Sequence, residues 1–333
     1  SFIAKGVSEY GLSIQIYSLG KIDAAPSYFG VDADVKKISF LNLTRLIFNG
    51  DRKVILTGLT KLNVLLAGLC FFASNTRLVT SVHLSISKKG DESYLKYNVR
   101  LILHRIFSIF SYRVVCVSKG IVSELNDIGV RRNVINIYNP CFNICDINPV
   151  RIGLYGDSGS IKFVSAGRLH SQKRFDRMLQ AFNDSRSYLP HGSTLTIYGE
   201  GPLYDSLKLQ IHNLELGEYV FLKGFSENLL KDLGRYNVFL LTSDYEGFGN
   251  VLAEALAVGL NCISMDIPHG PKEILDAGNF GVLTEDYTEL VNSLKNIDKH
   301  DFPMLMTSDL HSHLEQFTSF NFTERFVNEI LCC

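Results

Sequence analysis

The sequence predicts an α/β fold of two domains, each built around a doubly wound parallel sheet. Three observations lead to this expectation. The chain has 333 residues, which is long for one ordinary domain. Strand-like and helix-like segments alternate along the whole chain, and this alternation is typical of parallel sheets covered by helices. A hydrophobic content of 46% with 20% charged residues provides enough apolar side chains for two cores.

The first half of the chain contains six segments that read as strands and three that read as helices. The expected strands are residues 12–20, 35–42, 52–58, 76–83, 112–120 and 134–139. The expected helices are residues 61–73, 91–110 and 118–129, the last of which opens with a serine cap and closes on Gly129. The chain opens with a helix-like stretch, residues 1–11, where such a domain normally has a central strand and a glycine-rich turn. We therefore expect a first strand upstream of the given sequence; a natural chain with a rearranged sheet is the alternative.

The alternation lapses between residues 140 and 160, where Gly, Pro, Asn and Asp predict an interdomain linker. We place an N-terminal domain at 1–145 and a C-terminal domain at 146–333, whose last helix is expected to pack back on the first domain. The expected strands of the second domain are residues 161–169, 194–201, 219–225, 237–244, 260–266 and 280–285.

The charge differs between the two halves. Residues 1–150 contain 18 Lys and Arg against 10 Asp and Glu, whereas residues 151–333 contain 15 against 24. A basic first half predicts an anionic partner there, a phosphate-bearing substrate or a membrane surface; chance variation among solvated faces is the alternative. The basic residues concerned include Lys88, Lys89, Lys96, Arg100 and Arg105.

The seven cysteines predict a reducing compartment, because their number is odd and several lie within apolar runs. Cys141 and Cys145 are four residues apart, but no histidine-rich cluster accompanies them, which argues against zinc. The most apolar segment, residues 61–75, is too short to span a membrane. We expect a cytoplasmic protein that touches a membrane surface without crossing it.

Arg168 and Lys173 are the first candidates for chemistry, in the segment "SAGRLHSQKRFDRML". A strand ends at Ala166, and ligands of open α/β sheets bind at the carboxyl ends of strands. Two cations on such a loop can converge on a diphosphate. A solvated basic turn is the alternative, and we expect Arg174 and Arg177 on the helix surface.

Two further strand ends carry candidate residues. Gly199 and Gly201 in "TIYGEGP" permit close backbone approach to a ligand, although any strand-to-helix turn can have this composition. His83 follows another strand, where we expect the edge that faces the cleft between the domains; a structural histidine is the alternative.

The stretch "LLTSDYEGFGNVLAEALAVG" contains two carboxylates eight residues apart, Glu246 and Glu254. Gly247 and Gly249 prevent a helix from starting before about Asn250, so Glu246 lies in a loop and Glu254 in the second helical turn. The backbone N–H groups of residues 249–251 then form an anion site at the positive end of the helix dipole. The alternative is an acidic residue that favours the dipole and an exposed helix glutamate.

These segments together resemble the large family of retaining GT-B glycosyltransferases that includes bacterial lipopolysaccharide, O-antigen and capsule sugar transferases. The family's Glu-x7-Glu motif is present as "EGFGNVLAE", its GR…K element as "GRLHSQK" and its GxGP turn as "GEGP". "VSKGIVSEL" and "IYNP" resemble the end of its first domain. This sequence departs from the family pattern at its start. Members of the family carry a Gly-Gly loop there, close to the donor and the acceptor.

The resemblance implies a role for each matching residue. Arg168 and Lys173 would neutralise the donor diphosphate, Glu246 would hold the donor sugar, and Glu254 would accept from the ribose hydroxyls. His83 would lie over the donor sugar from the first domain. Backbone and base-pocket contacts would come from Gly247, Phe248, Gly249, Asn250, Val251, Gly199, Gly201, Gly224 and Phe225.

The implied reaction is transfer of a hexose or N-acetylhexosamine from a UDP-sugar, with retention, to a glycan acceptor such as a polyprenyl-diphosphate-linked saccharide. An Asp-x-Asp signature would indicate a metal site. The sequence contains "DAD" at residues 32–34, but this segment lies near the start of an expected strand of the first domain, which is not a plausible place. We therefore expect no metal or other cofactor. We see no protein nucleophile, which favours a front-face mechanism assisted by the leaving phosphate. We expect no nucleic-acid partner. The alternatives are an inactive sugar-nucleotide-binding or scaffold protein and a sugar-nucleotide epimerase.

Overall fold

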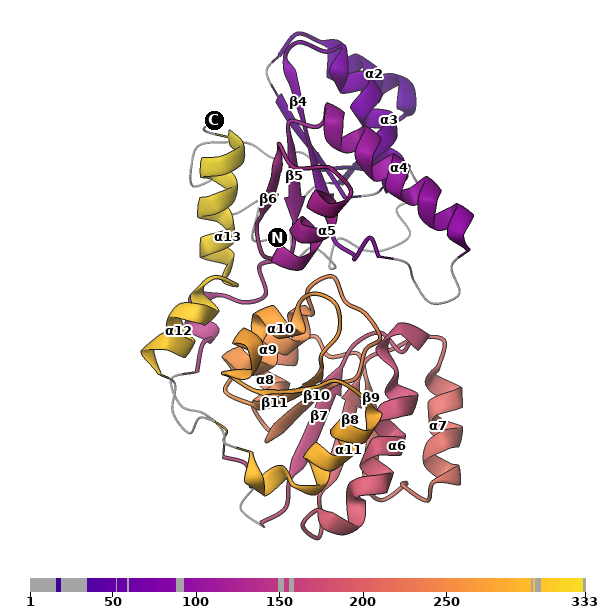
Figure 1. Ribbon diagram of the computed structural model, residues 1–333, viewed down its shortest axis with the longest axis vertical. Coiled ribbons are helices and arrows are strands. Elements are labelled where there is room, and N and C mark those ends of the chain that lie inside the picture. Colours follow the sequence, from indigo (N-terminus) through magenta and orange to yellow (C-terminus); the bar gives the residue numbers. More distant parts are fainter. Residues whose placement is uncertain are drawn as a thin grey trace. The chain divides into compact units, whose positions relative to one another are not determined.

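The computed structural model describes residues 16–18, 35–51, 53–58, 60–87, 93–148, 153–155, 159–300, 302 and 307–331. The chain divides into two compact units (Figure 1). Unit 1 comprises Ser1–Pro140 and Thr318–Cys333, and unit 2 comprises Cys141–Phe317. The expected helix at 1–11, the "DAD" segment and the pair Lys88 and Lys89 lie outside the described residues. In the described part of the chain, no helix combines the length and apolar content needed to cross a membrane.

Unit 1 contains a parallel four-stranded sheet in the order β3-β4-β5-β6. Its strands are β3 (Lys53–Thr57), β4 (Thr76–Val82), β5 (Arg113–Cys116) and β6 (Val134–Asn136). A separate parallel pair is formed by β1 (Ile16–Ser18) and β2 (Val35–Lys37). The helices are α2 (Phe40–Phe48), α3 (Thr60–Phe71), α4 (Tyr94–Phe110), α5 (Lys119–Asp127) and α13 (Ser319–Phe326).

The expected strand at 35–42 is wrong in its second half, because α2 begins at Phe40. The hydroxyl of Ser39 accepts from the N–H of Asn42 at 3.2 Å and so caps the helix. Leu43 and Ile47, four residues apart, are buried on one side of this helix. A spacing of four residues between buried positions is typical of a helix. Both residues follow the segment 35–42, so they did not enter the strand prediction.

The C-terminal helix α13 belongs to unit 1, as its apolar contacts show. Phe322, Phe326 and Ile330 are buried in one cluster with Val79 of β4, Val115 of β5 and Ile137. Figure 1 shows α13, in yellow, beside β5 and β6. The last segment of the chain therefore completes the core of the unit in which the chain starts.

Unit 2 contains a parallel six-stranded sheet in the order β12-β11-β10-β7-β8-β9. Its strands are β7 (Lys162–Ala166), β8 (Thr194–Tyr198), β9 (Val220–Gly224), β10 (Val238–Leu241), β11 (Asn261–Met265) and β12 (Val282–Thr284). The helices are α6 (Phe175–Ser185), α7 (Tyr204–Asn213), α8 (Leu229–Leu233), α9 (Asn250–Ala257), α10 (Pro271–Ile274), α11 (Tyr287–Lys295) and α12 (Ser308–Glu315). Figure 1 shows α6, α7 and α11 together on one side of this sheet, with α9 and α10 on the other.

The strand order of unit 2 reverses between β7 and β10. In chain order within the unit it reads 3-2-1-4-5-6, the doubly wound arrangement. β7 and β10 are neighbours, with Phe163 paired to Val238, although they are far apart in sequence. The connections that follow these two strands lead to helices on opposite sides of the sheet, α6 and α9 (Figure 1). In this class of sheet, ligands bind at the edge where the connections diverge. Both fold-class expectations, two units and parallel sheets, are therefore confirmed.

Phe326→Ala should destabilise unit 1, because it removes a buried aromatic ring that packs on β4 and β5. Large-to-small changes of this kind cost about 3 kcal/mol or more of unfolding free energy. The matched control is Phe320→Ala on the same helix, since Phe320 is 66% exposed and Phe326 only 6%. Urea denaturation followed by fluorescence would measure both. Equal losses in the two variants would contradict the placement of α13.

Candidate functional site

The carboxylate of Glu246 is the centre of the site. Glu246 follows β10 and is only 6% exposed. Its Oε1 accepts from the Nζ of Lys173 and from the hydroxyl of Ser243, both at 2.6 Å. A buried carboxylate without a partner is strongly unfavourable, so this ion pair compensates the charge and joins the loop after β10 to the loop after β7. The structure thus brings together two of the residues expected from sequence.

The loop after β7 is shaped to deliver Lys173 to this position. Gly167 has a positive φ of 157°, and an added Cβ would lie 3.2 Å from the Cε of Lys173, so the lysine stem lies directly against this glycine. Residues Ser171–Lys173 form a single 3₁₀ turn. Arg168 is exposed and, among the described residues, forms no ion pair. The loop therefore holds one cation in place and leaves a second available.

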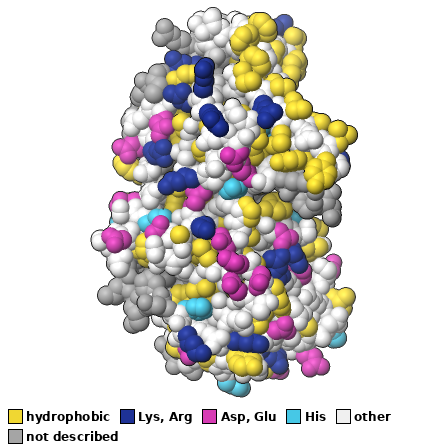
Figure 2. Space-filling view, in the orientation of Figure 1, with side chains coloured by type: hydrophobic (Ala, Val, Ile, Leu, Met, Phe, Trp, Pro, Cys, Tyr) yellow, Lys and Arg dark blue, Asp and Glu magenta, His cyan; other side chains and the backbone are white. Residues whose placement is uncertain are grey.

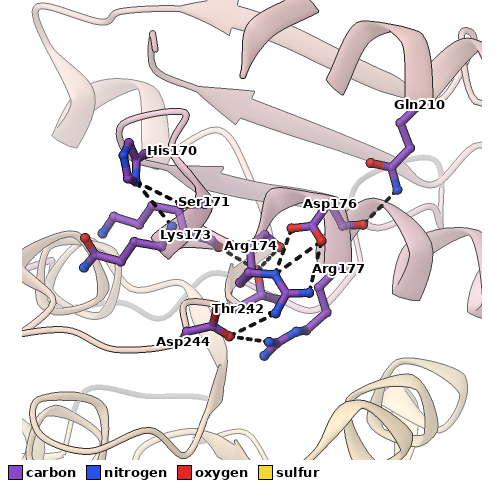
Figure 3. A network of polar contacts seen from close by, with 10 residues as sticks. His170, Ser171, Lys173, Arg174, Asp176, Arg177, Gln210, Thr242 and Asp244 are labelled. Atoms are coloured by element: carbon purple, nitrogen blue, oxygen red, sulfur yellow. Dashed lines mark hydrogen bonds and ion pairs between the residues drawn. The ribbon is translucent and has the colours of Figure 1, made fainter. Parts of the chain in front are cut away.

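A second network fixes the two loops to each other (Figure 3). Arg174, in a left-handed conformation at φ 50°, forms ion pairs with Asp176 and with Asp244 after β10, each at 3.1 Å. Arg177 also bonds to Asp244. Thr242 donates its hydroxyl to the backbone carbonyls of Lys173 and Arg174 at 3.2 and 3.0 Å. The backbone that follows the Lys173 side chain is therefore held by the segment after β10.

Arg174 and Arg177 lie at the start of α6 and are partly exposed, but the sequence did not predict their ion pairs. Arg177 has only 17% of its side chain exposed, and both guanidinium groups bind Asp244. Sequence reasoning also missed Ser243 and Gln172, whose amide donates to the carbonyl of Tyr245 at 2.8 Å. One feature of the sequence could have indicated these contacts. The acidic residue Asp244 follows the strand β10, and a doubly wound sheet can place that strand beside β7.

Gly199 and Gly201 lock the loop after β8 onto the loop after β7. An added Cβ at Gly199 would lie 1.9 Å from the carbonyl oxygen of Gly167, and one at Gly201 would lie 2.4 Å from that of Leu169. The N–H of Leu169 donates to the carbonyl of Glu200 at 2.9 Å. The sequence suggested glycines for approach to a ligand; in the structure they allow approach of one backbone segment to another.

The start of α9 lies as expected at Asn250. Gly249 occupies the N-cap position with φ 96°, a left-handed conformation that favours glycine, and has no side chain to cap the helix. Gly247 and Phe248 are buried in the preceding turn. Gly270 lies so close that an added Cβ would be 1.7 Å from the carbonyl oxygen of Phe248. The loop before α9 is therefore closely packed. In the first turn of the helix itself, Asn250 is exposed and Val251 is half-buried.

Glu254 lies in the second turn of α9 among buried apolar residues. Leu252, Ala253 and Ala255 beside it are fully buried. Burial raises the pKa of the Glu254 carboxyl group from 4.5 to about 7. Burial also raises the pKa of the Cys141 thiol, and the charge of Glu254 adds to this effect, which places the two side chains near each other. Within the described residues the Glu254 carboxylate has no hydrogen-bond partner, unlike that of Glu246.

The remaining predicted residues lie at other strand ends. Gly224 ends β9 with φ 72°, and its carbonyl accepts from the N–H of Gly199 at 2.7 Å. Phe225 after it is 67% exposed. His83 lies in unit 1, just after β4, where its Nε2 is 2.8 Å from the hydroxyl of Ser81. The unit 2 candidates are thus gathered at the carboxyl edge of one sheet, and His83 lies at the corresponding edge of the other.

The described residues contain no group of three or more His, Cys, Asp or Glu side chains placed to hold a metal ion. Of the expected basic residues, Arg100 donates to the carbonyls of Ile86 and Ser87, and Arg105 donates to that of Ile128. These two guanidinium groups therefore have structural partners within unit 1. Lys96 on α4 is exposed.

Residues 155–300, within unit 2, match the family model described as "Glycosyl transferases group 1". A curated relative from Campylobacter jejuni is 36% identical over 125 residues, which is 37% of this chain and 33% of the relative. It is named N-acetylgalactosamine-N,N'-diacetylbacillosaminyl-diphospho-undecaprenol 4-alpha-N-acetylgalactosaminyltransferase. The lipopolysaccharide 1,6-galactosyltransferase of Escherichia coli K12 is 26% identical over 164 residues, 48% of this chain and 44% of the relative. The matches thus span less than half of these relatives.

Solved structures resemble the chain over a larger part of its length. The apo form of the lipopolysaccharide outer core galactosyltransferase WaaB matches with a TM-score of 0.75 at 17% identity, covering 99% of this chain and 93% of that one. Anabaena Alr3699/HepE in complex with UDP-glucose matches with a TM-score of 0.71 at 19% identity, covering 90% and 86%. Together with the two parallel sheets, these likenesses show the GT-B fold.

Gly199→Ala should destabilise unit 2 severely, because the new Cβ would overlap the backbone of Gly167 and the residue would keep a positive φ. We expect a loss of about 3 kcal/mol or more of unfolding free energy. Gly217→Ala is the matched control, since Gly217 has open space around it and no positive φ. Chemical denaturation of both variants tests the interlocked loops, and a Gly199→Ala protein as stable as its control would disprove them.

The raised pKa of Glu254 predicts a pH-dependent stability. Between pH 4.5 and about 7 the folded protein retains a proton that the unfolded chain has lost, so its unfolding free energy falls as the pH rises. The expected loss is roughly 3 kcal/mol. Glu254→Gln should remove this slope and raise stability at pH 8, whereas Glu218→Gln, at an exposed position, should change neither. Denaturation midpoints across the pH range measure the effect; an unchanged slope in Glu254→Gln would refute it.

Proposed function

We propose that this protein is a glycosyltransferase that moves a hexose or N-acetylhexosamine from a UDP-sugar to a glycan acceptor, with retention of configuration and without a metal ion. One observation carries the proposal. A buried acid and a lysine, Glu246 and Lys173, form an ion pair at the point where the strand order of unit 2 reverses. That point is where open α/β sheets bind nucleotides and similar ligands.

The donor diphosphate would lie between the loop after β7 and the start of α9. Arg168 is exposed in that loop and, in the described part of the chain, has no ion-pair partner that would compete with phosphate oxygens. Lys173 is held in place by Glu246 and by the backbone of its loop. Breaking the sugar–phosphate bond builds negative charge on the leaving UDP, and preorganised cations and helix N–H groups stabilise such charge.

The donor sugar would bind at Glu246. Both hydrogen bonds to this carboxylate reach Oε1, which leaves Oε2 to accept from sugar hydroxyls. The ion pair with Lys173 holds the carboxylate in one orientation, and carboxylate oxygens are good acceptors of hydroxyl hydrogens. This arrangement supports a role in holding the sugar rather than in proton transfer.

The nucleoside would bind at Glu254 and after β9. The Glu254 carboxylate accepts no hydrogen bond from the described residues, so ribose hydroxyls would satisfy it; the pKa of about 7 means that acid weakens this contact. Gly224 and the exposed ring of Phe225 offer a surface for the base. UDP is favoured because two of the similar structures are described as complexes with UDP and UDP-glucose.

The reaction would follow a front-face route, in which the leaving phosphate takes the proton of the attacking acceptor hydroxyl. His83, at the carboxyl edge of the unit 1 sheet, would contact the donor sugar or the acceptor. For the acceptor we favour a lipid-diphosphate-linked saccharide in O-antigen or capsule synthesis. The name of the Campylobacter relative, which specifies a diphospho-undecaprenol-linked acceptor, supports this choice.

UDP release from a panel of UDP-sugars, with and without a polyprenyl-diphosphate saccharide, tests the proposal. Glu246→Gln and Lys173→Met should each lower kcat by about 10²–10³-fold, because each removes one charge that positions or stabilises the reacting groups. Lys208→Met, at an exposed lysine of α7, is the matched control and should keep full activity. Lys173→Met leaves the buried carboxylate of Glu246 without its ion-pair partner, which could unfold the protein. The double variant Lys173→Met/Glu246→Gln removes both charges and therefore serves as a folding control.

Other outcomes identify the alternatives. Binding of UDP-sugars without UDP release in any condition would indicate an inactive sugar-nucleotide-binding protein. Conversion of the sugar configuration while the UDP-sugar remains intact would indicate an epimerase. Activity that persists in chelator is expected, and NMR of the product should show the anomeric configuration of the donor; inversion would overturn the proposed mechanism.

A further inference from the structure

One face of α4 is apolar and exposed. Its side chains are Leu95, Val99, Ile102, Ile106, Ile109 and Phe110. Leu95 and Ile109 are 75% and 74% exposed, and Ile102 is 52% exposed. From Leu95 to Ile109 the positions recur every three or four residues, and Phe110 adjoins Ile109, so the six side chains form one stripe along about four helical turns. The other side of the helix already supplies the core contacts, through buried His104, Phe107 and Ser108.

The stripe continues onto α3 and α2. The ring of Phe71, at the end of α3, contacts the ring of Phe110, with the ring centroids 5.0 Å apart. The ring of Phe71 also contacts that of Phe72, with the centroids 5.3 Å apart. Phe71 and Phe72 are 62% and 77% exposed. Further exposed apolar side chains on these two helices are Leu65, Phe40, Leu41 and Phe48. Figure 2 shows hydrophobic side chains gathered over the region of α2, α3 and α4. We call this surface the α2–α4 face.

The charges on these helices are of one sign. α2, α3 and α4 contain Arg45, Lys61, Lys96, Arg100 and Arg105 and no Asp or Glu. The helices of unit 2 differ, since α6, α7 and α11 each carry acidic residues. The most exposed apolar side chains of unit 2, Tyr188, Leu209 and Phe225, lie on three separate segments, and α7, which carries Leu209, also carries Asp205. Among the described helices, the combination of several exposed apolar side chains with positive charge alone is found on α2, α3 and α4.

We propose that the α2–α4 face binds the surface of a membrane that contains anionic lipids, with its apolar side chains inserted among the acyl chains. Interfacial helices combine an apolar face with flanking Lys and Arg, because burial of apolar area and attraction to anionic headgroups act together. A protein partner that covers an apolar patch has no such requirement for positive charge without acid. This surface shares no residue with the proposed donor site, and it is expected to bind membranes whether or not the proposed transfer reaction is correct.

Co-sedimentation with vesicles tests the proposal on the full chain. The vesicles contain either phosphatidylcholine alone or phosphatidylcholine mixed with phosphatidylglycerol. The protein should sediment with the mixed vesicles, and added salt should weaken the binding. The triple variant Leu95→Gln/Ile102→Gln/Ile109→Gln should lower the partition coefficient for mixed vesicles by about tenfold or more, because it removes three inserted side chains. The variant Arg45→Gln/Lys96→Gln should reduce both the binding and its salt dependence.

Matched controls separate this surface from the proposed donor site. Leu209→Gln changes an apolar side chain of unit 2 that is 60% exposed, and it should bind vesicles as the unchanged protein does. Binding of UDP, measured by calorimetry, should be equal in all variants, and thermal unfolding should show that each remains folded. A protein that releases no UDP from any donor would still be expected to bind the vesicles.

Three outcomes would overturn the proposal. The first is no binding to the mixed vesicles. The second is equal binding by the triple variant and the unchanged protein. The third is a dimer that the triple variant converts to a monomer while vesicle binding stays the same, since the face would then be an interface between two copies of this chain.

Discussion

The carboxylate of Glu246 is buried in unit 2, and a buried negative charge has to be compensated. Lys173 compensates it from the loop after the neighbouring strand, and this requirement explains much of the local structure. Thr242 holds the backbone at Lys173, Asp244 holds the arginine that follows, and Gly167 makes room for the lysine stem. The ion pair can form only because β7 and β10 are adjacent, so the position of the site follows from the order of the strands.

The two units present different chemistry on their surfaces. In unit 2 the polar groups are concentrated at the carboxyl edge of the sheet, where they bind one another at short distances. In unit 1 an apolar surface lies along helices α2, α3 and α4. The carboxylate of Glu124 and the guanidinium group of Arg100 meanwhile hold residues Ser85 to Ser87 after β4. The proposed donor site lies in unit 2 and the proposed lipid-binding surface lies in unit 1, so the two functions would depend on different residues.

Local signals predicted those parts of the structure that local interactions determine. Ser118 caps α5 and Gly129 follows its end with a positive φ, and α9 begins at Asn250 because Gly249 precedes it. The partnership of Arg174 with Asp244 could not be read in this way, since it depends on which strands become neighbours. The exposure of the apolar face of α4 could not be predicted from the sequence for another reason. A periodic apolar pattern shows that a helix has an apolar face, but not whether protein covers it.

The interlocked glycines at the edge of the unit 2 sheet limit how this protein can be redesigned. The carbonyl oxygens of Gly167 and Leu169 occupy the space that side chains would need at Gly199 and Gly201. Either loop therefore fits only a partner with the same backbone path. If the proposed function is correct, a change of sugar specificity by loop grafting would require the segments after β7 and β8 to be transplanted together, with a compatible segment after β10. Side-chain changes at exposed positions such as Phe225 avoid that constraint and are the simpler starting point.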